Sequence, residues 1–129
     1  MKAGIVIFMF SLAVWACAPV KENISTSAAI AQESKDSTEY ELIITDPRFD
    51  EWYEFNYTPA KDYSNEYYRS KNEIAVMNWN HYYTTGQYIN IIEEYINYEP
   101  RIDYGIEVNR KLYWYFKYMR NEYKIRLFF

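Results

Sequence analysis

Five carboxylates beyond residue 38 are the first candidates for chemistry, because hydrolysis of a glycoside requires two carboxyl groups about 5 to 10 Å apart across a cleft. They are Asp46, Asp50, Glu51, Asp103 and Glu107. Each has a structural explanation as well. Asp46 and Asp103 are placed to cap helices, and the other three fall in early helical turns, where negative charge complements the helix dipole. The sequence therefore predicts no catalytic residue among them.

The sequence also offers few residues that could bind a metal or act as an activated nucleophile. His81 is the only histidine, so a histidine-based metal site would have to be completed by carboxylates alone. Only two glycines follow residue 38, and neither a glycine-rich phosphate loop nor a Ser-His-Asp order can be drawn. We expect no metal and no cofactor, and we interpret His81 as a residue near the end of a helix.

The only cysteine, Cys17, follows an apolar run that starts at Ala3, is broken only by Ser11 and is preceded by Lys2. A positive charge followed by a short apolar core is typical of a secretory signal. The core of about 13 residues is shorter than the roughly 20 that a membrane-spanning helix needs. Residues 1–16 are therefore predicted to be a cleaved signal peptide.

The residues Val14, Trp15, Ala16 and Cys17 resemble a bacterial lipobox, in which a signal peptidase cuts before a cysteine that carries diacylglycerol. The resemblance implies that Cys17 is the lipidated N-terminus of the mature protein. Two or three acyl chains are enough for stable anchoring in a membrane. The alternatives are an ordinary residue of the apolar run and an unpaired thiol in an exported protein.

Residues 18–38 are rich in small and polar residues and contain no aromatic side chain. Such a composition buries too little apolar surface to offset the entropy of ordering, so with Cys17 we expect a flexible linker over residues 17–38. Asp36, Ser37 and Thr38 resemble the motif at which exported Bacteroidetes proteins are O-glycosylated. That resemblance implies a sugar on Ser37, and the alternative is a plain polar linker.

Residues 39–129 are enough for one small domain, and they contain all 16 tyrosines of the chain. Wide aromatic rings fill the thin core of so small a domain efficiently. The formal net charge is −4 for the whole chain, and loss of Lys2 with the signal makes it more negative. A net negative charge argues against binding to nucleic acid or anionic lipid through a basic field. The only local excess of positive charge is Lys117, Arg120, Lys124 and Arg126, near the C-terminus.

Helix caps and hydrophobic periodicity predict the helices and strands that would position any site. Residues 39–45 predict a strand, and Asp46 followed by Pro47 predicts a helix over 47–55. Ser64 caps a second helix that runs to residue 83, with Gly86 as its stop. Residues 87–98 are ambiguous between strand and helix, and their β-branched residues favour a strand slightly.

Asp103 is predicted to cap the last helix, which covers residues 106–123. We therefore expect an α+β fold, a small helix-dominated domain of about three helices with two short strands able to pair. The C-terminal phenylalanines, Phe128 and Phe129, are expected to pack back onto the core.

Two segments, YELIITDPRFDEW (40–52) and INYEPRIDYGIEVNRKLYWYF (96–116), resemble the recurring core of a family of small uncharacterised Bacteroidetes lipoproteins with a domain of unknown function. Members of that family share a strand that ends in an Asp-Pro helix start, and an Asn-Tyr-Glu-Pro segment that leads into an aromatic helix. The resemblance covers the lipid signal and most of residues 39–129. It implies no activity.

The last helix contains four consecutive aromatic residues at 113–116, and a helix cannot turn all four toward one core. When Leu112 and Tyr115 face inward, Trp114 and Tyr118 lie on another face. This second strip either packs under residues 89–98 or forms an exposed platform, with Lys117 beside it, on which a sugar ring or an aromatic side chain of a partner stacks.

Two classes of function remain open. The first is an envelope lipoprotein with a non-enzymatic binding or structural role, anchored in the outer membrane, facing the periplasm and contacting an envelope protein or glycan. The alternative is a small hydrolase or lyase that acts on envelope polysaccharide or peptidoglycan. The lack of a catalytic constellation favours the first.

Overall fold

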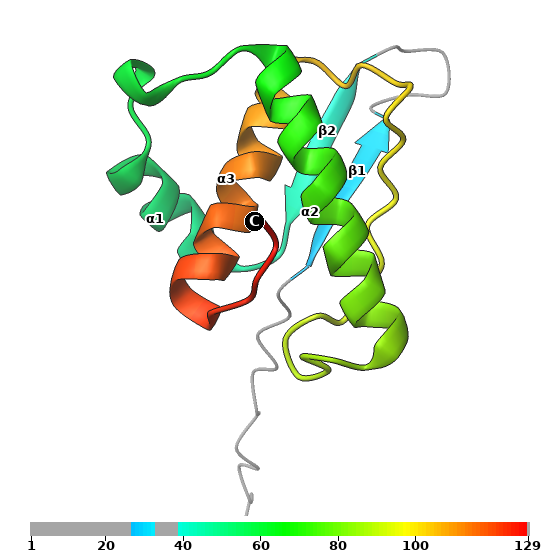
Figure 1. Cartoon of the computed structure of the whole chain (residues 1–129). Coiled ribbons are helices and arrows are strands. Elements are labelled where there is room, and N and C mark those ends of the chain that lie inside the picture. Colours follow the sequence, from blue (N-terminus) through cyan, green and yellow to red (C-terminus); the bar gives the residue numbers. More distant parts are fainter. Residues whose placement is uncertain (1–26, 33–38, 129) are drawn as a thin grey trace, which may run out of the picture.

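A computed structural model of the protein describes residues 27–32 and 39–128, so the predicted modification positions Cys17 and Ser37 lie outside the described residues. The elements follow the order β1 (Ala28–Gln32), β2 (Tyr40–Ile44), α1 (Pro47–Asn56), the short 3-10 helix η1 (Pro59–Lys61), α2 (Asn65–Thr85) and α3 (Ile106–Tyr123) (Figure 1). The strands form one antiparallel pair. The predicted α+β class, with three helices and two short strands, is confirmed.

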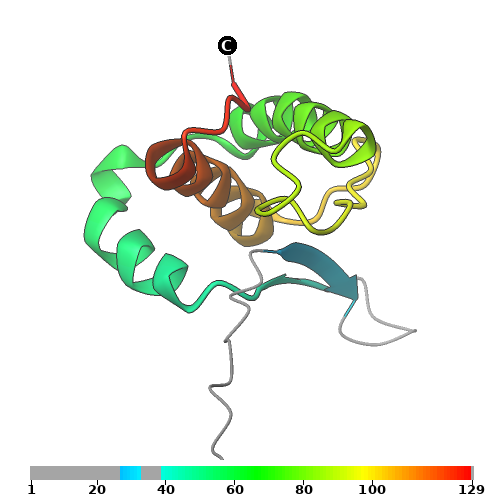
Figure 2. The ribbon, with the colours of Figure 1, turned by 90° about the horizontal axis from the view of Figure 1, so that it is seen from below.

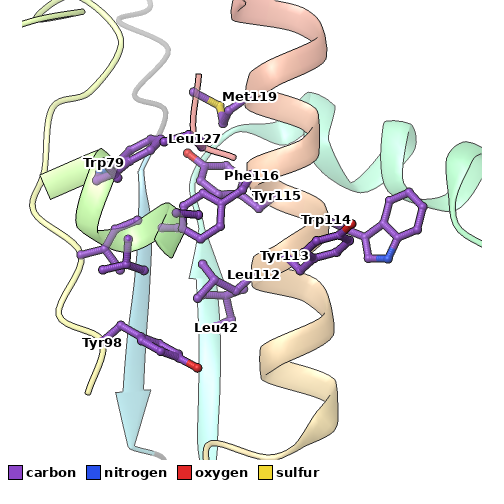
Figure 3. Packing of buried hydrophobic residues seen from close by; sticks show 14 of the residues in the cluster. Leu42, Trp79, Tyr98, Leu112, Tyr113, Trp114, Tyr115, Phe116, Met119 and Leu127 are labelled. Carbon is purple, nitrogen blue, oxygen red and sulfur yellow. The ribbon is translucent and has the colours of Figure 1, made fainter. Parts of the chain in front are cut away.

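Helix α3 lies at the centre of the domain. It packs against α2, α1 and β2, and Figure 2 shows the two-stranded sheet on one side of the helices, with α1 beside α3 and away from α2. In Figure 3, Leu112 points toward Leu42 of β2, whereas Trp114 points away from the sheet toward α1. A helix with apolar residues around most of its circumference requires this cover on several sides.

The start of α1 is fixed by Asp46, as predicted. Its carboxylate accepts a hydrogen bond from the Arg48 backbone N–H at 3.0 Å, and the same buried carboxylate accepts from the hydroxyls of Tyr118 at 2.7 Å and Tyr123 at 3.1 Å. Burial raises the pKa of Asp46, but these hydrogen bonds and those of the Arg48 guanidinium lower it by more, so the pKa lies below its ordinary value. The ionised carboxylate thus joins α1 to the C-terminal half of α3.

The boundaries of α2 also follow the predicted signals. The Ser64 hydroxyl accepts a hydrogen bond from the Tyr67 backbone N–H at 3.2 Å. At the other end, Gly86 has a φ of 73°, a left-handed conformation that glycine adopts without steric cost. No helix among the described residues has the combination of length and apolar character that crossing a bilayer requires.

The cap of α3 differs from the prediction. Gly105, with a φ of 88°, is the N-cap, and no side chain caps the helix. Asp103 instead accepts a hydrogen bond from the Gly105 backbone N–H at 3.0 Å. The chain therefore makes one more turn after Asp103 before the helix begins, and the positive φ at that turn favours glycine.

Strand β1 corrects the predicted linker over residues 17–38. Residues 28–32 pair with β2 from Ala28 opposite Ile44 to Gln32 opposite Tyr40. Ala28 is only 1 % exposed, because a small side chain fits closely against the aromatic core. Composition alone indicated a linker, since alanines carry little apolar surface and the strand depends on its pairing with β2 and on the burial of Ala28 in the core.

The slight preference for a strand over residues 87–98 is wrong. This segment has no strand, and side chains of α2 bind its backbone. Asn80 donates from Nδ2 to the Ile96 carbonyl and accepts from the Ile96 N–H, both at 2.8 Å, while Trp79 Nε1 donates to the Glu94 carbonyl at 2.8 Å. Backbone groups satisfied in this way need no partner strand, and β2 pairs with β1 instead.

The C-terminal segment packs back onto the core, as predicted, up to the last described residue. Ile125 and Leu127 are fully buried, and the ring of Phe128 contacts Tyr113. Asn78 of α2 donates to the Leu127 carbonyl at 2.9 Å. The segment thus covers a further side of the contact between α2 and α3.

Two neighbouring alanines of β1 test whether this strand belongs to the domain. Ala28→Asp places an uncompensated charge in the core, and we expect the free energy of unfolding to fall by about 3 kcal/mol or more. Ala29→Asp introduces the same charge at an exposed position, so its effect should stay within about 0.5 kcal/mol. Urea unfolding followed by tryptophan fluorescence measures both, and equal effects would show that β1 is not packed on the core.

Candidate functional site

An open cavity of about 730 Å³ lies where β2 and α3 both begin. This is the upper end of the domain in Figure 1. The residues that line it come from the first part of β2 with the residue before it, and from residues 103–111. They are Glu39, Tyr40, Glu41, Leu42, Asp103, Tyr104, Gly105, Ile106, Glu107, Val108 and Lys111. We call this cavity the acidic pocket.

Two tyrosines hold the two walls of the acidic pocket together. The rings of Tyr40 and Tyr104 meet edge to face, with their centroids 4.8 Å apart. Tyr104 is 8 % exposed, and its hydroxyl accepts a hydrogen bond from the Glu99 backbone N–H at 2.9 Å. The turn before α3 is therefore fixed against the start of β2 by aromatic packing.

Charge in the acidic pocket is strongly one-sided. Four of its lining residues are acidic and one, Lys111, is basic. The Lys111 ammonium lies 3.3 Å from the carboxylate of Asp50, on α1, so part of its charge is neutralised outside the pocket. Carboxylates gathered around a concave surface raise the local concentration of cations.

Asp103 has the best defined geometry of the four carboxylates. Its two oxygens accept hydrogen bonds from the Asn65 side-chain amide at 3.1 and 3.3 Å, and one also accepts from the Gly105 backbone N–H at 3.0 Å. These hydrogen bonds lower the pKa of Asp103. An aspartate held in its ionised form is suited to attract a positive charge and poorly suited to donate a proton.

A network of asparagine side chains holds Asn65, the residue whose amide donates to Asp103. Asn109 of α3 donates to Asn65 Oδ1 at 2.8 Å and accepts from the Tyr98 hydroxyl at 3.1 Å. Asn72 of α2 donates to the Asn109 carbonyl at 2.8 Å. This network was not predicted from the sequence, although Asn72 follows the buried Tyr68 by one helical turn and so interrupts an apolar stripe with an amide.

The five candidate carboxylates are divided by the fold. Asp103 and Glu107 line the acidic pocket together, whereas Asp46 is buried near the opposite end of α3 and Asp50 pairs with Lys111. Glu51 lies on α1 outside the acidic pocket.

The structure also places the only histidine. His81 is exposed on α2, and its ring contacts Tyr82. Within residues 27–32 and 39–128, no group of three histidine, cysteine or acidic side chains is placed to hold a metal ion.

The exposed platform on α3, one of the two arrangements considered for Trp114, Tyr118 and Lys117, is contradicted. Trp114 and Tyr118 are each 3 % exposed, so the strip is buried, but their ring contacts are with α1 and not with residues 89–98 as the other arrangement predicted. Helix α1 covers them, because the ring of Trp52 contacts both. The Lys117 ammonium lies 4.5 Å from the centroid of the Trp114 ring, and burial lowers the pKa of Lys117. These three residues form part of the core and its edge.

The model of a family of unknown function, DUF6146, matches residues 5–128, and the chain belongs to this family. The resemblance to proteins with a domain of unknown function is confirmed at this level. Neither the curated proteins nor the solved structures include one that matches the chain.

Proposed function

We propose that this protein is an envelope lipoprotein, anchored through lipidated Cys17, whose domain binds a cationic segment of another envelope protein in the acidic pocket. Its role is binding, without catalysis. The place we assign to it is the outer membrane, facing the periplasm, in an envelope of the Bacteroidetes type. Ser37, in the segment between the two strands, is proposed as an O-glycosylation position.

The anchor is supported by the order of residues in the N-terminal segment. Cys17 directly follows a short apolar run with a positive charge before it, and the DUF6146 match starts at residue 5, so it includes this cysteine. The resemblance of residues 40–52 and 96–116 to Bacteroidetes lipoproteins supports the same assignment. A thioether-linked diacylglycerol would hold the protein on a membrane.

The observation that carries the binding role is the composition of the acidic pocket. Its four carboxylates attract positive charge, and the half-buried ring of Tyr40 beside them can stabilise an ammonium or guanidinium group. A lysine- or arginine-rich segment combines both contacts. The pocket is open enough to admit several side chains, as a short basic segment requires.

Hydrolysis remains the second candidate because Asp103 and Glu107 line the same cavity. A glycosidase needs one of its two carboxyl groups to stay protonated near neutral pH, which requires a raised pKa. The pKa of Asp103 is lowered instead. Asp103 could therefore act only as the base or nucleophile. We prefer the binding role because it needs only the charge that the ionised Asp103 already carries.

Replacing the proposed lipidation residue tests the anchor. In cells fed an alkyne fatty acid, we expect the wild-type protein to carry the label and to fractionate with the outer membrane. Cys17→Ser should lose the label and become soluble or stay uncut, since no second acylation signal is evident in the chain. A labelled, membrane-bound serine variant would contradict the assignment of Cys17.

Charge removal inside the acidic pocket tests the binding role. The probe is a short fluorescent oligolysine peptide, with an oligoglutamate peptide as the control ligand, and the readout is fluorescence anisotropy at low salt. We expect Glu41→Gln with Glu107→Gln to weaken binding of oligolysine by about tenfold or more, since each lost charge contact contributes roughly 1 kcal/mol.

The matched control removes two charges elsewhere. Glu54 and Glu93 are exposed and lie outside the pocket lining, so Glu54→Gln with Glu93→Gln changes the net charge by the same amount. This variant should bind oligolysine nearly as the wild type does. Equal loss in both double variants would mean that the peptide follows net charge alone, and the binding role of the pocket would be refuted.

A further inference from the structure

We propose that the end of the domain opposite the acidic pocket lies against the membrane, with the loop of residues 86–92 touching the surface of the bilayer. This inference rests on the proposed function, because it takes the lipid on Cys17 as the anchor. It adds an orientation and a contact surface that the anchor alone does not specify. The occupant of this surface is the bilayer that holds the lipid.

The length of chain between lipid and domain carries the first step. Ser27 is held at the edge of the sheet, since its carbonyl accepts a hydrogen bond from the Thr45 N–H at 3.0 Å and its own N–H donates to Thr45 Oγ1 at 2.9 Å. From Cys17 to Ser27 there are about 10 peptide units, which span at most roughly 35 Å when fully extended. Because β1 belongs to the domain, the chain between Cys17 and the first residue held in the domain is much shorter than a linker over residues 17–38.

This reach is comparable with the size of the domain. Helix α3 has 18 residues and is about 27 Å long. A domain held by so short a connection, attached at one end, stays within about its own length of the membrane. The attached end is therefore the one that meets the bilayer most often.

The attached end also contains the 86–92 loop. Strand β1 begins at the lower end of the domain in Figure 1, where α2 and α3 end, and the loop follows directly after α2. Figure 2, which views the molecule from below, shows this loop in front of the helices. The acidic pocket, at the beginning of α3, lies at the other end.

The 86–92 loop exposes an apolar side chain while hydrogen bonds hold its backbone in place. Ile89 is 69 % exposed, although the loop around it is packed and hydrogen-bonded. The Tyr88 carbonyl accepts hydrogen bonds from the N–H groups of Ile91 and Ile92, both at 2.8 Å, and Ile92 is 2 % exposed. An exposed isoleucine held in this way can enter the headgroup region without a cost in ordering the loop.

Three tyrosines lie close to the exposed isoleucine in the chain: Tyr82, Tyr83 and Tyr88. Tyr83, at the end of α2, is 44 % exposed, and the Tyr88 ring packs edge to face against Tyr82 at 5.1 Å. Tyrosine is enriched where proteins meet the boundary between membrane and water, because its ring is apolar and its hydroxyl is polar. An exposed isoleucine with tyrosines near it in the chain fits that boundary.

Charge does not direct the contact. The exposed cations near this end, Arg120, Lys124 and Arg126, are accompanied by the exposed acids Glu93, Glu94 and Glu122. The attraction to an anionic surface is therefore small, and the apolar loop together with the short connection determines the orientation.

Single thiols test this orientation in the mature lipidated protein, in which the Cys17 sulfur is blocked by the lipid. Ile89→Cys introduces a thiol in the loop, and Phe55→Cys introduces one on α1, where the native side chain is 89 % exposed. Each variant is bound to vesicles of phosphatidylethanolamine and phosphatidylglycerol and treated with a membrane-impermeant maleimide. The same thiols in a mature chain carrying Cys17→Ser, free in solution, give the reference rates.

We expect binding to vesicles to slow labelling of Ile89→Cys by about tenfold, because a side chain of this size is buried at the membrane surface. The labelling rate of Phe55→Cys should stay unchanged. Equal labelling of Ile89→Cys on vesicles and in solution would overturn the orientation while leaving the anchor intact. If the protein without an added thiol fails to float with vesicles and reacts with maleimide at Cys17, the anchor is absent and the orientation falls with it. An unchanged melting temperature confirms that each variant is folded.

Discussion

The covering of α3 around most of its circumference is the constraint on which the rest of the structure depends. The helix carries large side chains around most of its circumference, so the sheet, α1, α2 and the C-terminal segment each bury a different strip of it. The ionised Asp46 carboxylate holds the contact between α1 and α3 in place, because it caps α1 and accepts hydrogen bonds from the hydroxyls of Tyr118 and Tyr123 near the end of α3. Removing any of these covers exposes aromatic rings to water.

Helix α3 is covered along its length, and its two ends have different surroundings. At the beginning of α3, the chain turns at Asp103 and Gly105 and opens the acidic pocket beside β2. At its end lie the start of β1 and the 86–92 loop. The proposed function and the proposed orientation use these two ends separately, since a binding pocket must face away from the bilayer to receive a partner.

The local elements were predictable from the sequence, and the contacts between distant segments were not. Asp46, Ser64 and Gly86 act on neighbouring backbone groups, so they revealed α1 and α2 directly. Strand β1 escaped because small alanines give little signal and its stability comes from β2. The acidic pocket combines residues before 43 with residues after 102, and only the packing of α3 against β2 brings them together. The strip of Trp114 and Tyr118 was recognised, but the helix that covers it could not be inferred from periodicity.

The central claim is that α3 separates a membrane-facing end from a partner-facing end. Photo-crosslinking in living cells tests it most directly, with a benzophenone-bearing amino acid placed either at position 106, in the lining of the acidic pocket, or at position 89, in the loop. The account predicts adducts with polypeptide from position 106 and adducts with lipid from position 89. Lipid adducts from position 106, or polypeptide adducts from position 89 alone, would contradict it.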